Sequence, residues 1–163
     1  MLRLSLRSIT DRDLEFLYEV YASTRADELA VVPWDDAQKE EFLQMQFGAQ
    51  HSYYQQHYSD ATFDVIEVDG RPVGRCYVQR RVDEFRIVDI ALLPAHRGQG
   101  IGSELLNELI DEAEAARLPV TIHVEQHNPA IHLYTRLGFT LIDDTGVYYL
   151  MKRTPPEPSS GPS

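Results

Sequence analysis

The sequence predicts a mixed α/β fold built on a single sheet, and two observations support this. Segments with the period-two alternation of strands are interspersed with segments whose apolar residues recur at helical spacing. Their order along the chain is strand, two helices, three strands, helix, strand, helix and two strands. A chain of 163 residues has the size of one domain, so one sheet covered by helices is the expected architecture.

The first part of the chain predicts one strand and two helices. The alternation of Leu2, Leu4 and Leu6 is typical of a half-buried strand. Thr10 or Asp11 can serve as the N-cap of a first helix. Its apolar positions recur at helical spacing: Leu14, Phe16, Leu17, Val20 and Tyr21. Pro33 and Trp34 end this helix, and Asp35 or Asp36 can cap a second one, whose end the sequence leaves open.

Glycines and prolines mark the limits of the remaining elements. Asp69-Gly70 and Gly146 predict tight turns between strands, and Gly138 suits the end of a short helix that begins at Pro129. The expected strands are 62–68, 73–78, 85–93, 120–124, 139–142 and 147–151, and the expected helices are 103–117 and 129–137. The segment 85–93 is mostly apolar, which predicts a strand buried on both faces.

Charge and composition exclude several classes of partner. The chain has 15 basic and 26 acidic residues, a net charge of −11, and no basic block, which argues against nucleic acid and an anionic membrane surface. No segment has the roughly 20 apolar residues of a membrane span. Cys76 is the single cysteine, expected to be buried as a small hydrophobe and without an internal disulfide, so we expect a cytoplasmic protein. The histidines lack metal-ligand spacing, and no metal is predicted.

A glycine-rich turn lies between an apolar strand and an amphipathic helix. The segment Arg97-Gly-Gln-Gly-Ile-Gly102 lets the backbone curve tightly and approach a ligand, while the following helix directs its free N–H groups toward it. Phosphate is the natural ligand there. A Walker loop is excluded because no lysine follows the glycines. A dinucleotide-binding turn stays open as an alternative, although Ser103 replaces its third glycine.

Two motifs together resemble the GCN5-related N-acetyltransferase (GNAT) superfamily. The pattern Arg97-x-x-Gly100-x-Gly102 resembles motif A of that superfamily. The segment His127-Asn-Pro-Ala-Ile-His-Leu-Tyr-Thr-Arg-Leu-Gly-Phe139 resembles its motif B. The motifs occur in the family's order and spacing. The resemblance implies a GNAT domain over residues 1–153, followed by a disordered Pro/Ser-rich tail at 154–163.

The resemblance further implies an acyl-CoA N-acyltransferase fold with acetyl-CoA as the acyl donor. Such a fold has a mixed, mostly antiparallel sheet of six or seven strands with about four helices, and its fourth and fifth strands splay apart around the donor. Backbone groups on the fourth strand would hold the pantetheine arm and stabilise the oxyanion of the thioester, and the glycine turn would hold the pyrophosphate. The residues implied in cofactor binding are Ile90, Ala91, Leu92, Arg97, Gly98, Gln99, Gly100, Ile101, Gly102, Ser103 and Asn128.

The catalytic residues are less well defined by the resemblance. Tyr134 occupies the family position of the general acid that protonates the leaving thiolate, which favours that role over the alternative of a core aromatic. His123 aligns with a catalytic glutamate of many relatives, and Asp89 is the competing base, although His123 could also be an ordinary strand residue. Asn128 could contact the cofactor, cap the short helix, or do both.

The implied function is acetyl transfer to a primary amine of a small molecule, peptide or protein by direct attack in a ternary complex. A non-catalytic acyl-CoA-binding regulatory module is the alternative. Residues 11–41, in the region that shapes the acceptor pocket of similar enzymes, hold ten acidic and three basic side chains. This excess fits either a solvated helix face or attraction of a cationic amine. A homodimer is compatible with the resemblance.

Overall fold

The computed structural model describes residues 3–157, and its strands form one mixed sheet of seven. The hydrogen-bonded strand order is β1-β2-β3-β4-β5-β7-β6. The strands are β1 (Leu4–Ser8), β2 (Thr62–Val68), β3 (Arg71–Arg80), β4 (Phe85–Leu92), β5 (Val120–Glu125), β6 (Thr140–Asp144) and β7 (Tyr148–Arg153). The helices are α1 (Leu14–Ala30), α2 (Asp36–His57), α3 (Ile101–Ala115) and α4 (Ile131–Arg136), with the 3-10 turns η1 (Asp11–Asp13) and η2 (Pro94–His96). The predicted element order is confirmed.

The described chain divides into two compact units. The first contains residues 3–79 and 89–101, and the second contains residues 80–88 and 102–157. The strand β4 contributes its first half to the second unit and its second half to the first. Two sequence expectations concern residues outside 3–157: Leu2 as part of the first strand, and positions 158–163 of the predicted disordered tail. The described part of that tail, residues 154–157, forms neither helix nor strand.

In the first unit, the strands β1, β2 and β3 form an antiparallel sheet. The β2–β3 hairpin turns at Asp69 and Gly70, whose φ angles are 52° and 80°. Two consecutive residues with positive φ suit the right-handed twist of the strands that they connect. The predicted turn is therefore confirmed, and β3 is longer than expected because its pairing with β2 extends to Arg71.

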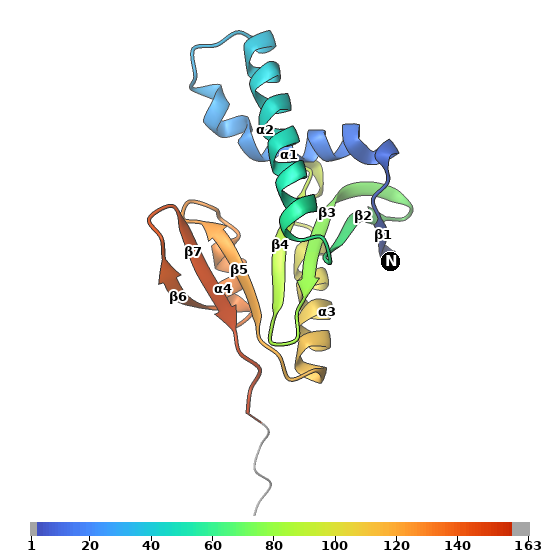
Figure 1. Ribbon diagram of the computed structural model, residues 1–163, viewed down its shortest axis with the longest axis vertical. Helices are drawn as coiled ribbons and strands as arrows, with labels where there is room; N and C mark the ends of the chain where they lie inside the picture. The colour runs from blue at the N-terminus through green and yellow to red at the C-terminus, as the bar shows by residue number, and fades with distance from the viewer. Residues whose placement is uncertain (1–2, 158–163) are drawn as a thin grey trace, which may run out of the picture. The chain divides into compact units, whose positions relative to one another are not determined.

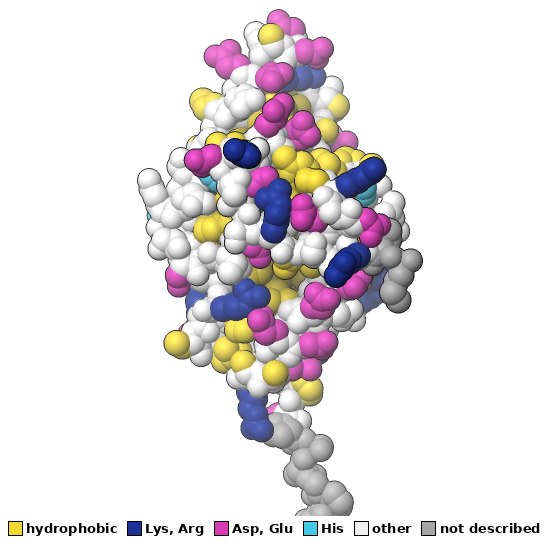
Figure 2. Space-filling view, turned by 90° about the vertical axis from the view of Figure 1, so that its right-hand side faces the viewer, with side chains coloured by type: hydrophobic (Ala, Val, Ile, Leu, Met, Phe, Trp, Pro, Cys, Tyr) yellow, Lys and Arg dark blue, Asp and Glu magenta, His cyan; other side chains and the backbone are white. Residues whose placement is uncertain are grey.

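The helices α1 and α2 form a hairpin in the same unit (Figure 1). The ring of Phe47 on α2 packs against Tyr18 and Tyr21 on α1 at centroid distances of 5.9 and 6.0 Å. Asp35 caps α2 as predicted: its carboxylate accepts from the Gln38 backbone N–H at 2.8 Å, and the Gln38 side chain accepts from the Asp35 N–H. Figure 2 shows acidic side chains gathered on the upper part of the molecule, where this hairpin lies.

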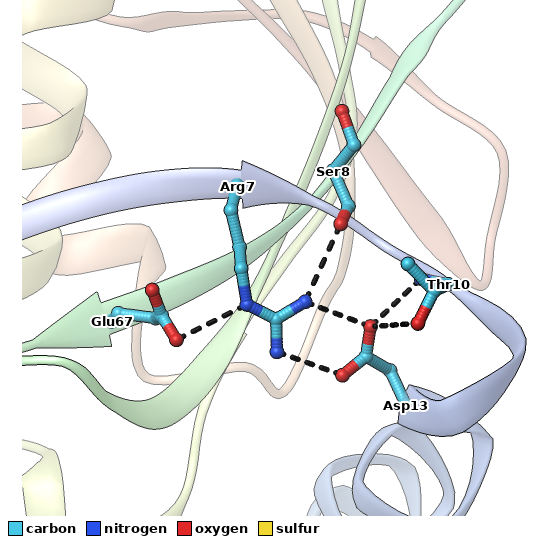
Figure 3. Close-up of polar contacts among 5 residues, drawn as sticks. All are labelled: Arg7, Ser8, Thr10, Asp13 and Glu67. Carbon is cyan, nitrogen blue, oxygen red and sulfur yellow. Dashed lines mark hydrogen bonds and ion pairs between the residues drawn. The ribbon is translucent and has the colours of Figure 1, made fainter.

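Arg7 connects β1, β2 and the start of the first helix (Figure 3). Its guanidinium donates to both oxygens of Asp13, at 2.9 and 2.8 Å, and to Glu67 at 3.1 Å. The Asp13 carboxylate also accepts from the backbone N–H of Thr10 at 2.7 Å. These hydrogen bonds, chiefly that from Arg7, lower the pKa of Asp13 to about 2. The first helical turn is thus fixed to the sheet by a charge pair that local sequence does not reveal.

In the second unit, β7 lies between β5 and β6 and is antiparallel to both. The apolar face of α3 is buried as its periodicity predicts, with Leu105, Leu106 and Ile110 each no more than 5% exposed. Gly138 and Gly146 have φ angles of 96° and 90°, which confirms the helix end and the turn expected at these positions.

The starts of two helices and the burial of one strand differ from expectation. The helix α3 begins at Ile101 rather than 103, and α4 begins at Ile131 because residues 129 and 130 form the turn before it. The prediction that the segment 85–93 is buried on both faces is wrong for its second half: Phe85 and Ile87 are buried, but residues 88–92 are half-buried. The reason is pairing, because β5 is in register only with the first three residues of β4.

Candidate functional site

The pairing of β4 with β5 ends early. The parallel register covers Phe85–Ile87 of β4 against Val120–Ile122 of β5, while β5 remains paired with β7 as far as Glu125. The parallel ladder thus ends at the point where the resemblance implies that the fourth and fifth strands part. Among the described residues, Ile90, Ala91 and Leu92 have no partner on β5, so this edge of their backbone is not used by the parallel ladder. Unused backbone donors and acceptors of this kind suit a ligand that pairs with a strand.

The glycine-rich turn requires glycine at two of its three positions. Gly98 and Gly100 have φ angles of 74° and 84°, in the left-handed region where a side chain is strained. Gly102 lies in the first turn of α3 without a positive φ, and an added Cβ would meet Leu133 at an ordinary contact distance of 3.8 Å. Ser103 follows in the same turn of α3 and is half-buried. The turn thus delivers the chain to the N-terminus of α3, where backbone N–H groups lack helical partners.

The polar side chains of the turn are held by the first unit. Arg97 donates through Nε to the Leu92 carbonyl at 3.0 Å and through Nη2 to the Ser23 hydroxyl at 3.3 Å. Gln99 donates to the Ala95 carbonyl at 3.1 Å. Arg97 is exposed, and these contacts keep its positive charge at the end of β4. The charge therefore lies beside the predicted phosphate-binding turn.

Asp89 takes part in a buried polar cluster of the first unit that the sequence does not predict. Its Oδ2 accepts from Arg75 Nη2 at 2.7 Å and from the Tyr54 hydroxyl at 3.1 Å. Arg75 is only 2% exposed and also donates to Gln50 at 2.9 Å. Burial alone would lower the pKa of Arg75, but the Asp89 carboxylate outweighs it and keeps that pKa above its usual value. Oδ2 of Asp89 is therefore already engaged by two donors, one of them a permanent cation.

Aromatic rings surround the Tyr54 side of this cluster. The Tyr54 ring lies edge-on to Tyr77 at 5.9 Å and has Tyr53 and Tyr58 at 6.3 and 6.2 Å. Burial, followed by the charge of Asp89, raises the pKa of Tyr54 well above its usual value, and burial raises the pKa of Tyr77 to about 12. Both hydroxyls accordingly stay protonated at neutral pH, and Tyr54 remains a hydrogen-bond donor.

Gly74 on β3 is a second feature that the sequence analysis missed. A Cβ at this position would overlap the carbonyl oxygen of Ala91 and crowd Leu92. Only glycine therefore lets β3 approach this part of β4 so closely. The available signal was an isolated glycine inside an otherwise regular strand pattern, which marks a bulge or a close backbone approach.

His123 is exposed on β5 in the second unit, and its partner there is Arg86. The ring nitrogen Nδ1 lies 3.2 Å from Arg86 Nη1, and Arg86 is held in turn by Thr121 at 2.7 Å. Partial burial and then the charge of Arg86 lower the pKa of His123. The imidazole is accordingly neutral at pH 7 and has Nε2 on the side away from this contact.

Asn128 and Tyr134 flank the start and the middle of α4. The Asn128 side-chain oxygen accepts from the backbone N–H of Ala130 at 2.9 Å, so the residue shapes the turn before the helix as a cap would. Tyr134 is 3% exposed and packs against the Phe139 ring at 5.6 Å. A general acid can be buried in this way as long as its hydroxyl reaches the leaving group.

Other kinds of site were sought in the described residues. A hollow of about 240 Å³ is lined by Glu125, Gln126, His127, Gly146 and Val147, none of which is a predicted site residue. Within residues 3–157, no three His, Cys, Asp or Glu side chains are grouped so that they could hold a metal ion. No described helix has both the length and the apolar character needed to cross a membrane. Cys76 is buried, as expected.

Comparison with known proteins identifies the relatives of the chain. A family model described as Acetyltransferase (GNAT) family matches residues 16–139. A ribosomal protein bS18-alanine N-acetyltransferase of Haemophilus influenzae is 29% identical over 91% of this chain and 86% of its own. A Bacillus subtilis protein provisionally given the same activity is 31% identical over 82% of this chain and 79% of its own. The PaiA N-acetyltransferase of Thermoplasma acidophilum, solved with coenzyme A, superposes with a TM-score of 0.70 at 18% identity, covering 93% and 99% of the two chains.

Proposed function

We propose that this chain acts on the amine of a peptide or protein. The chain belongs to the GNAT acetyltransferase family, and it transfers an acetyl group from acetyl-CoA to a primary amine. The observation that carries this proposal is that two relatives matching most of the chain are named for acetylating the alanine of a ribosomal protein. An N-terminal α-amine is therefore the first acceptor to test. The names of all these relatives are those of enzymes, which favours catalysis over the non-catalytic module.

The acidic α1–α2 hairpin supports a cationic acceptor. Residues 11–41 carry ten acidic and three basic side chains, and Asp27, Glu28, Asp35 and Asp36 are exposed there. An amine approaches as an ammonium ion at neutral pH, and the negative field of an acidic surface raises the local concentration of such a cation. A basic sequence following the amine would be attracted in the same way. We therefore expect peptides with a basic sequence after the N-terminus to be preferred.

For the donor, we assign the pyrophosphate to the turn 97–103 and the pantetheine arm to Ile90, Ala91 and Leu92. The positive φ of Gly98 and Gly100, the charge of Arg97 and the start of α3 together provide what a phosphate needs. The half of β4 that is unpaired with β5 provides backbone groups for the amide-bearing arm. Asn128 is kept as a cofactor contact through its amide nitrogen, because its oxygen is engaged with Ala130.

For the chemistry, we assign the general base to His123 and the general acid to Tyr134. The ammonium gives a proton to neutral His123, directly or through water, and the amine nitrogen then attacks the thioester carbonyl. As the tetrahedral intermediate collapses, the carbon–sulfur bond breaks, and the thiolate takes a proton from the Tyr134 hydroxyl. The extra proton on the former amine nitrogen passes to the Tyr134 phenolate, directly or through water, which leaves a neutral amide and restores the phenol. Asp89 is the weaker candidate for the base because its Oδ2 already accepts two hydrogen bonds, one of them from a buried cation. A homodimer and a cytoplasmic location remain predictions, the first to be tested by light scattering.

The test is an assay of thiol release from acetyl-CoA over a set of amines, with calorimetry of CoA binding beside it. The acceptors are a peptide with an N-terminal alanine followed by basic residues, its N-acetylated copy, spermidine, benzylamine and aniline. We expect turnover of the free peptide and none of the acetylated copy. CoA binding with no turnover of any amine would favour the non-catalytic module, and turnover confined to small amines would refute a peptide acceptor.

A further inference from the structure

We propose that Asp89 is the receptor for the ammonium group of the acceptor and that Tyr54, on α2, is the residue that positions it. The inference rests on the proposed acetyl transfer and specifies its substrate class: amines that bind as cations. It gives Asp89 a role other than general base, and it gives a role to Tyr54, which the sequence motifs do not include.

The first step concerns the charge of Asp89. Arg75 is 2% exposed, and a buried guanidinium requires an anion close to it. The Asp89 carboxylate supplies that anion at 2.7 Å, and Asp89 itself is 17% exposed at its side chain. Arginine keeps its proton under all assay conditions, so Arg75 is a permanent donor to one oxygen of Asp89. The other oxygen of Asp89 is the one that can receive a second cationic donor.

The second step concerns the two oxygens of Asp89. Oδ2 accepts both hydrogen bonds, from Arg75 and from Tyr54. Oδ1 accepts none from residues 3–157, and it is not among the described side-chain atoms that are buried without a partner, which are Arg75 Nε and the Tyr77 hydroxyl. One oxygen of an ionised carboxylate thus stays available to an incoming donor. An ammonium group has three such donors, and a hydrogen bond between opposite charges is among the stronger kinds.

The third step concerns what fixes the carboxylate. A single bond from Arg75 would leave Asp89 free to rotate about its terminal torsion, because sp³–sp² torsions are soft. The Tyr54 hydroxyl, 3.1 Å from the same oxygen, removes that freedom. The Tyr54 ring is itself restrained by Tyr58 and Tyr77 at 6.2 and 5.9 Å. Tyr54 consequently determines which oxygen is presented to the acceptor.

The surroundings of Tyr54 favour a cation with an adjoining apolar group. The rings of Tyr53, Tyr54 and Tyr58 lie within 6.4 Å of one another, and Tyr53 is 50% exposed. Aromatic faces attract ammonium ions and also cover the carbon chain that carries them. A primary ammonium on a short aliphatic or benzylic carbon therefore fits this subsite better than a neutral aromatic amine.

The first experiment compares the wild-type protein with the Tyr54→Phe variant, with Tyr148→Phe, at an exposed tyrosine on β7, as the control. The acceptor is the amine with the highest kcat/KM in the set described above. Removing a charge-assisted hydrogen bond predicts a KM for this amine about tenfold higher in Tyr54→Phe. Its kcat is expected to stay within about threefold, with the KM for acetyl-CoA and the melting temperature nearly unchanged. Tyr148→Phe is expected to match the wild type.

The second experiment measures competitive inhibition by benzylamine and by benzyl alcohol, its neutral analogue of the same shape. We expect the wild-type protein to bind benzylamine about tenfold more tightly than benzyl alcohol, and Tyr54→Phe to lose most of that difference. Equal inhibition of the wild type by the two compounds would overturn the proposal, as would a lower melting temperature in Tyr54→Phe with an unchanged KM. Absence of any thiol release from acetyl-CoA would instead count against acetyl transfer itself.

Discussion

Arg75 donates a hydrogen bond of 2.7 Å to Asp89 from a position where the guanidinium is almost completely withdrawn from water. The pair joins β3 to the part of β4 that bears the predicted donor-binding backbone. Removing the anion alone leaves a buried charge without compensation, whereas removing both charges does not. The stability of this region therefore depends on the pair more than on either residue.

Asp89→Leu should lower the free energy of unfolding by about 3 kcal/mol, because Arg75 then lacks its counter-charge. Replacing the pair together, as Arg75→Met with Asp89→Leu, should recover at least half of that loss. Urea denaturation followed by circular dichroism measures both values. A single variant as stable as the wild type would mean that the Arg75 charge is compensated elsewhere.

Gly74→Ala tests the close approach of β3 to β4. The added Cβ would overlap the Ala91 carbonyl, a main-chain group that cannot rotate away. We expect a loss of about 1–3 kcal/mol in unfolding free energy together with weaker CoA binding by calorimetry. Gly48→Ala is the control, since Gly48 lies on α2 with open space around it, and alanine there should stabilise by up to about 1 kcal/mol. Equal effects at the two glycines would contradict the prediction.

Tyr134→Phe separates the chemical role of Tyr134 from its packing role. The ring contact with Phe139 is retained in this variant, and only the hydroxyl is removed. If the phenol protonates the leaving thiolate, kcat should fall by about 10²-fold or more while the Kd for CoA is unchanged. Tyr148→Phe, at an exposed tyrosine on β7, should leave kcat unaltered. An undiminished kcat in Tyr134→Phe would assign that tyrosine to the core.

Features that depend on local backbone geometry were predictable from the sequence. The turns at Gly98 and Gly100, the end of α4 at Gly138 and the N-cap at Asp35 each follow from what one residue type does to its own neighbourhood. These are the features that carry the family motifs. The order of the elements was predictable for the same reason, because the hydrophobic periodicity that indicates a helix or a strand is a property of each segment alone.

Features that depend on pairing between distant segments were not predictable. Arg75 and Asp89 are 14 positions apart, and Tyr54 and Asp89 are 35 apart, so their contact exists only once α2, β3 and β4 are packed. The exposure of residues 88–92 likewise depends on where β5 stops pairing. The apolar composition of these residues predicts burial on both faces. The sequence of one strand does not reveal where the neighbouring strand stops pairing with it.

The pairing of His123 with Arg86 predicts a pH effect on activity. Partial burial and the Arg86 charge lower the pKa of His123, so a base at this position works down to a pH below 6.5. Arg86→Gln removes the charge of Arg86, so the pKa of His123 should rise. The acidic limb of the pH profile of kcat/KM should therefore move to higher pH. The ionisation of the amine affects the pH profiles of the wild type and of Arg86→Gln equally when both are measured with the same acceptor. Superimposable profiles would exclude His123 as the base.

The link between Arg7 and Asp13 predicts a stability that depends on pH. The carboxyl of Asp13 has its pKa lowered from 3.8 to about 2 in the folded protein, so the ionised form is favoured by folding. The contribution is complete above about pH 4 and is lost as the pH falls toward 2. Because Arg7 is 39% exposed, solvent screens the pair, and its share is on the order of 1 kcal/mol.

Asp13→Asn should therefore be less stable than the wild type at pH 7, and the difference should shrink between pH 4 and pH 2. Thermal unfolding at a series of pH values measures this convergence. Arg7→Met should produce a similar loss at neutral pH, and the double variant should lose less than the sum of the two, because both remove the same interaction. A stability difference between Asp13→Asn and wild type that stays constant down to pH 2 would refute a contribution from the ionised Asp13 carboxylate.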